Sequence, residues 1–124
     1  MKLVLPWPAP ALWPNRRVHW SKLHTARKRS RREAWALVSR ELVAQGLLNW
    51  AQSLARGDTN IAVRLTFHPP DRRKRDLDNM LATQKGTLDG IAQALCVDDS
   101  RFVPTLEWGE VKSKGCVIIE LVEL

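Results

Sequence analysis

The stretch from residue 61 to residue 70 constrains the fold most firmly. Apolar side chains alternate with more polar ones here, at Ile61, Val63, Leu65 and Phe67. A period of two is typical of a strand that buries one face. The two prolines that follow end the strand, because proline cannot donate to a sheet ladder. The segment therefore predicts a strand that leads directly into the charged stretch after it.

Periodicity and turn residues predict the other elements in the same way. The expected elements are a strand at 2–5, an irregular loop at 8–20, a helix at 21–45 closed by Gly46, a second short helix or a frayed continuation at 47–58, a helix from Leu77 or Asp78 to about Leu95, and strands at 101–111 and 116–123 that form a hairpin through 112–115. Pro104 favours an edge position or a bulge for the first hairpin strand.

These elements predict a single domain over residues 1–124. Their order, β-α-β-α-β-β, is typical of an α/β (α+β) fold with a mixed sheet of about four strands and two main helices. A chain of 124 residues with 44% hydrophobic residues and six tryptophans can bury one core without disulfides.

Charge and composition favour a polyanionic partner inside the cell. The net charge is +7 and the pI is about 10.1, which favours nucleic acid. No apolar run approaches the roughly 20 residues of a membrane span, and the proline-broken N-terminus is not typical of a signal peptide. Two cysteines without a CxxC spacing and three scattered histidines favour reduced thiols and no zinc site. We expect a cytoplasmic protein of a bacterial or phage-infected cell.

The segment from residue 16 to residue 32 carries eight cations and no acidic residue. They are Arg16, Arg17, Lys22, Arg27, Lys28, Arg29, Arg31 and Arg32. A solvated helix normally mixes both signs of charge, so this imbalance favours contact with phosphates over plain solubility. A calmodulin-like or membrane-surface helix is the alternative, but it lacks a wide apolar face. Tryptophans of the preceding loop could stack on unpaired bases or pack over the edge of the core.

Residues 71–99 concentrate the residues that carry chemistry. Four cations, Arg72 to Arg75, run into Asp76-Leu77-Asp78-Asn79, and Asp98-Asp99 follows the expected helix. Carboxylates are the hard oxygen ligands that Mg²⁺ prefers, together with water and substrate phosphate. Each piece has an ordinary structural reading: a helix N-cap, a polar turn, a solvated charge run. Their combination favours hydrolysis of a phosphodiester.

The motifs RRKRDLDN, Lys85 four residues before Asp89, and VDDS resemble the signature of the RusA family. These are Holliday junction resolvases, common in phages and prophages, and a looser likeness extends over nearly the whole chain. The resemblance implies a homodimer that cuts four-way DNA with Mg²⁺, or Mn²⁺ as a substitute, and has neither a small-molecule cofactor nor a membrane partner. It implies that Asp76, Asp78 and Asp99 bind the metal with Asp98 accessory, and that these three and Lys85 are catalytic. The DNA-binding residues are then expected to be Arg16, Arg17, Arg27, Lys28, Arg29, Arg31, Arg32, Arg72, Arg73, Lys74 and Arg75.

Two features depart from a simple version of this site. Lys85 lies seven residues after Asp78, where the family pattern has its lysine four residues after. On one continuous helix both offsets stay near the face of Asp78. A helix of about 18 residues spans roughly 27 Å, so Asp99 cannot meet Asp76 along it. Either the helix breaks near Gly86 or Gly90, or a partner subunit supplies the third carboxylate.

Three functions remain open from the sequence. The first is a Mg²⁺-dependent endonuclease for DNA recombination and repair that makes paired symmetric cuts. The second is an inactive junction-binding protein of the same fold, which the displaced lysine favours. The third is an RNA-binding module, which lacks an RNP or GXXG signature. Asn79 and Asp89 are interpreted as local structure, with a supporting role at the metal site as the alternative.

Overall fold

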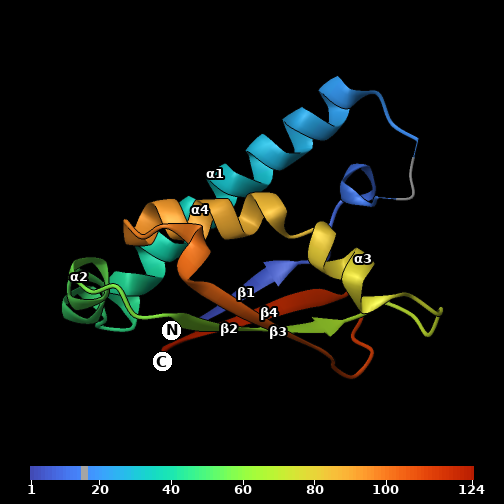
Figure 1. Cartoon of the computed structure of the whole chain (residues 1–124). Coiled ribbons are helices and arrows are strands. Elements are labelled where there is room, and N and C mark those ends of the chain that lie inside the picture. Colours follow the sequence, from blue (N-terminus) through green and yellow to red (C-terminus); the bar gives the residue numbers. More distant parts are fainter. Residues whose placement is uncertain (15–16) are drawn as a thin grey trace.

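The computed structural model describes residues 1–14 and 17–124 (Figure 1). Its elements, in chain order, are β1 (Lys2–Pro6), the short 3-10 helix η1 (Pro10–Leu12), α1 (Trp20–Ala44), α2 (Leu48–Arg56), β2 (Ile61–His68), α3 (Leu77–Ala82), α4 (Lys85–Leu95), the 3-10 helix η2 (Asp99–Arg101), β3 (Phe102–Trp108) and β4 (Cys116–Glu123). A small α+β domain with a four-stranded mixed sheet is thereby confirmed. The segment 47–58 holds a helix of its own, since Gly46 takes a left-handed φ of 66° and ends α1.

The sheet order is β1-β4-β2-β3, which corrects the predicted hairpin. Strand β2 lies between β3 and β4, and it pairs with β3 in parallel and with β4 antiparallel. The physical reason is burial: alternate side chains of β2 are completely buried, whereas most of β3 is exposed. Strand β2, with its buried inward side chains, therefore takes a central place, and β3 lies at the edge. The edge position expected from Pro104 is confirmed.

The helices cover one face of the sheet (Figure 1). Side chains of Leu3, Val63, Phe67 and Ile119 point into this layer and are at most 1% exposed. The opposite face of the sheet carries exposed Val4, Val103 and Val122 among charged residues. The core thus lies entirely between the sheet and the helix layer.

Helix α1 enters the hydrophobic core with its C-terminal half, whereas part of its N-terminal half packs against α4. Its fully buried residues are Ala34, Val38 and Leu42, while its N-terminal half extends beyond the sheet (Figure 1). This arrangement exposes the basic half predicted to contact phosphates. None of the described helices, α1 included, combines the length and apolarity needed to cross a membrane.

The helix expected from about residue 77 to residue 95 is broken, but not at a glycine. Helix α3 ends at Ala82 and α4 begins at Lys85. The break lies at Thr83 and Gln84, where the Thr83 hydroxyl donates to the Met80 carbonyl at 2.6 Å and so competes with the helical ladder.

The two glycines serve the packing of α4 against α1 instead. A Cβ at Gly86 or Gly90 would collide with the backbone carbonyl of Arg27 or Arg31. Glycine here allows two helix backbones to approach closely. The helix thus breaks near Gly86, as one of the two predicted routes allowed, but the glycines do not cause the break. Their role is to bring α4 directly beside the basic helix.

Candidate carboxylate centre and basic surface

The first carboxylate pair stands at the start of α3. Asp76 occupies the N-cap position with an extended backbone, and Asp78 lies in the first turn. Both residues are exposed. Within the described part of the chain, the Asp76 side chain makes no capping hydrogen bond to α3. Its carboxylate oxygens are therefore not engaged by the helix and remain available as ligands.

The basic loop before this pair is ordered by Arg75 and Asp71. The Arg75 guanidinium donates to the Asp71 carboxylate at 2.7 Å and also to the Arg73 carbonyl at 3.2 Å. The same carboxylate accepts the Arg73 backbone N–H at 3.0 Å. The pKa of Asp71 is lowered by this backbone hydrogen bond and then by that from Arg75. Arg75 therefore holds the loop in shape, while the side chains of Arg72, Arg73 and Lys74 stay exposed toward solvent.

A second carboxylate group gathers near the C-terminal end of α4. Asp89 is half-buried on α4, and Asp98 and Asp99 follow where Cys96 turns the chain through a left-handed φ of 56°. Burial raises the pKa of Asp89, and so do its hydrogen bond with Asp99 and the negative charge of Asp99, while Lys85 and Arg31 act in the opposite direction. Burial and the neighbouring carboxylate therefore outweigh the two cations.

Asp98 has a partner of its own. Its carboxylate accepts the Ser100 backbone N–H at 2.8 Å and caps η2. The hydrogen bonds with Ser100 lower the pKa of Asp98, so it stays ionised. The polar-turn interpretation of this segment is therefore confirmed for Asp98, whose second oxygen can still serve as an accessory ligand.

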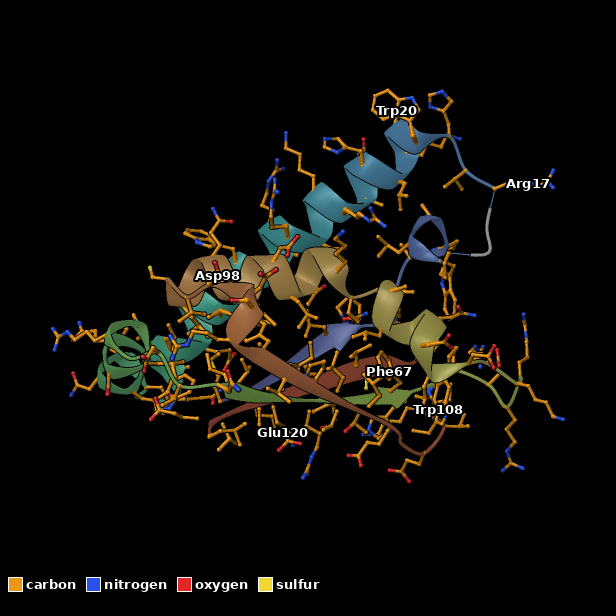
Figure 2. All side chains as sticks on the ribbon, viewed as in Figure 1. Arg17, Trp20, Phe67, Asp98, Trp108 and Glu120 are labelled. Atoms are coloured by element: carbon orange, nitrogen blue, oxygen red, sulfur yellow. The ribbon has the colours of Figure 1, made fainter. Side chains whose placement is uncertain are left out.

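The basic half of α1 borders this second group. Arg31 influences Asp89 directly, and Lys28, Arg31 and Arg32 line a hollow of about 210 Å³ with Trp35 and Gln93. Arg29 instead pairs with Glu33 at 2.9 Å on the exposed surface, and such a pair contributes little. Arg17 is exposed just before α1 (Figure 2), and Lys22 is exposed in the first turn of that helix. Arg16 lies outside the described residues.

The chain does not unite the two carboxylate groups by itself. In the described residues, no three side chains of Asp, Glu, His or Cys gather closely enough to hold a metal ion. Helix α4 has 11 residues, and a helix of that length spans about 16 Å. Figure 2 places Asp98 at the end of α4 remote from α3. Of the two routes left open by the sequence, the break in the helix occurs but leaves Asp76 and Asp78 apart from Asp98 and Asp99.

Lys85 belongs with the second group and not with Asp78. It is the first residue of α4, so the expectation that it shares one continuous helix with Asp78 was wrong. One turn later on the same helix stands Asp89, on which it exerts its charge. The sequence interpretation also underrated Asp89. Its spacing from Lys85 was visible, but its contact with Asp99 depends on the left-handed turn at Cys96, which no periodicity reveals.

The Asp89–Asp99 contact predicts an unusual effect on stability. A carboxyl whose pKa is raised by folding adds stability below its unfolded pKa of about 3.9 and loses that contribution as pH rises through the folded pKa. Asp89→Asn should therefore raise the melting temperature at pH 7 without divalent metal, and the gain should shrink toward pH 4. Thermal unfolding in EDTA at both pH values measures this. Asp58→Asn, in the exposed loop after α2, is the control, and an equal gain there would contradict the assignment.

Comparison with known proteins gives one strong similarity. A protein of Xylella fastidiosa (strain Temecula1), described as an uncharacterized protein, is 39% identical over 121 residues, covering 96% of this chain and 74% of the Xylella protein. No protein-family model matches the chain.

Proposed function

We propose that this chain, which belongs to the same family as the Xylella fastidiosa protein, is a Mg²⁺-dependent endonuclease of the RusA type. It would act as a homodimer and resolve four-way DNA junctions by paired, symmetric phosphodiester hydrolysis, in recombination and repair. The observation that carries the proposal is the division of the aspartates into two groups, each beside its own cluster of cations. A carboxylate next to phosphate-binding cations is the arrangement that metal-dependent phosphodiester hydrolysis requires.

The division of the aspartates supports a site completed by a second subunit. In a two-fold dimer, a contact made by one protomer is repeated by the other. If Asp76 and Asp78 approach Asp99 of the partner subunit, the reverse contact forms as well. Two equivalent centres then exist, and a two-fold junction presents two equivalent strands to them. Such a dimer would make paired symmetric cuts.

The donor set fits Mg²⁺ in its chemistry. Asp76 and Asp78 provide exposed carboxylate oxygens, and Asp89 and Asp99 bring two further carboxylates into contact. A magnesium ion held by Asp76, Asp78 and Asp99 of the partner subunit, with Asp98 accessory, would activate water and polarise the phosphate. Mn²⁺ is the expected substitute.

The cations next to the two groups of aspartates would bind and position the DNA. Arg72, Arg73 and Lys74 lie two to four residues before Asp76, so a phosphate that they hold would lie beside the first carboxylates. Lys28, Arg31 and Arg32 do the same beside Asp89 and Asp99. Lys85, exposed at the start of α4, would stabilise the charge that develops on the phosphate or the leaving oxygen.

A junction-binding protein that does not cut is the second candidate. The observation in its favour is that Lys85 lies on a different helix from Asp78. If cutting requires a lysine beside Asp76 and Asp78 within the same subunit, this chain lacks it on α3, where the residue at the family position is Ala82. Such a protein would keep the basic surface and bind junctions without Mg²⁺.

Junction cleavage separates these candidates. The purified protein is incubated with a synthetic four-way junction or a matching linear duplex, in Mg²⁺ or in EDTA. We expect paired nicks in opposite arms, on the junction only and in Mg²⁺ only. Tight junction binding without cleavage in either condition would favour the non-cutting protein, and the absence of both would overturn the proposed function.

A further inference from the structure

A hollow of about 610 Å³ lies between the loop after β1 and the basic loop before α3. Its lining consists of Trp7, Pro8, Pro10 and Trp13 on one side and Asp71, Arg73, Lys74 and Arg75 on the other. The volume is within the range of about 300 to 1,000 Å³ that is usual for small-ligand sites. Aromatic faces and cations thus meet at one place, directly before Asp76.

The aromatic side of the hollow is held in place. The rings of Trp7 and Trp13 have centroids 6.0 Å apart and are tilted by 47°, and both side chains pack against the hydrophobic core. Because the rings are not parallel, they do not close onto each other as a stacked pair. The Arg75 guanidinium lies 5.4 Å from the centroid of the Trp7 ring, so Trp7 is engaged by Arg75 while Trp13 has no such cation beside it in the described residues.

The basic side of the hollow carries an excess of positive charge. Three cations face one carboxylate, and that carboxylate belongs to Asp71, which is bound to Arg75 at 2.7 Å. The Arg75 side chain is only 13% exposed, whereas the Arg73 side chain is 82% exposed. Arg75 therefore serves the structure of the hollow. Arg73 also approaches Asp71, at 3.4 Å, but its side chain is largely in solvent and can turn with Lys74 toward an anion from outside.

We propose that this hollow binds one unpaired nucleotide, with its base stacked on Trp13 and its phosphate held by Arg73 and Lys74. A base within a duplex is stacked on both sides, and only an unpaired one can offer a face to a side chain. The branch point of a junction is where a base most readily leaves its stack. The inference rests on the proposed function for the identity of the DNA, and it deepens that function, because the next phosphate along the strand would lie beside Asp76.

Binding of single-stranded DNA tests the hollow without any need for cleavage. The probe is a short oligothymidylate, titrated in EDTA and followed by quenching of tryptophan fluorescence and by a gel-shift assay. Loss of a stacked base weakens binding by about 5- to 150-fold, and we expect that loss for Trp13→Ala. Trp13→Phe keeps an aromatic face and should recover most of the affinity, and a Trp13→Ala protein that melts as the unaltered protein does would exclude a defect in folding. Melting temperatures of both variants are measured alongside.

The matched control is Trp20→Ala. Trp20 is 71% exposed at the tip of α1, away from the hollow (Figure 2), and its loss should leave oligothymidylate binding nearly unchanged. Equal binding by Trp13→Ala and the unaltered protein would overturn the inference, even if the protein cuts junctions. A selective loss for Trp13→Ala would support it, even if no junction is cut and the proposed function fails.

The same variants locate the nucleotide on the junction. A four-way junction with 2-aminopurine at the branch point or within an arm is bound in EDTA, and the fluorescence of the two is compared. We expect a change in emission at the branch point that Trp13→Ala removes. A change of equal size in the arm, or one that survives Trp13→Ala, would contradict placement of the branch-point base in the hollow.

Discussion

Asp76→Asn is expected to lower the rate of junction cleavage in Mg²⁺ by about 10³-fold or more, because an amide replaces an anionic metal ligand and metal-ion catalysis supplies several kcal/mol. Junction binding should persist or tighten, since one negative charge beside the DNA phosphates is removed. The fold should be unaffected. Asp76 is exposed and its side chain does not cap α3 among the described residues, and asparagine is as good as aspartate at an N-cap position. Single-turnover cleavage and gel-shift titrations measure the two effects separately.

The control for this loss is Asp58→Asn, which removes one exposed carboxylate from the loop between α2 and β2. Its cleavage rate should stay close to that of the unaltered protein. If Asp76→Asn cuts at a normal rate, Asp76 is not a metal ligand. If Asp76→Asn no longer binds junctions, Asp76 acts in DNA binding, and this result also contradicts its assignment as a metal ligand.

The parts of the fold that the sequence predicted correctly are those governed by local pattern. The alternation at 61–68 and the apolar spacing in 21–45 define β2 and α1, because side-chain period determines which face is buried. Strand order is not local. The hairpin expected between 101 and 123 failed because β2, whose inward side chains are completely buried, inserts between β3 and β4. Two strands that are neighbours in the sequence need not be neighbours in the sheet, because burial decides which strand lies at its centre.

The sequence suggested the residue types of the candidate site but not their arrangement in space. The basic run and the aspartates were evident from charge alone. The grouping was not, because Thr83 breaks the helix with a side-chain hydrogen bond and the Cys96 turn carries Asp99 back toward Asp89. The glycines that the sequence suggested as break points instead allow α1 and α4 to touch. In each case a tertiary contact decided between two local options.

The most direct test of a centre shared between two subunits uses mixed dimers. Asp76→Asn and Asp99→Asn chains carry different affinity tags, are produced together, and the heterodimer is isolated by two purification steps. In a shared centre, both substitutions fall in one site and the other site is intact. The heterodimer should therefore nick one strand of the junction at about half the unaltered rate, while each homodimer is inactive. A heterodimer as inactive as the two homodimers, beside an active unaltered dimer purified in the same way, would contradict the shared centre.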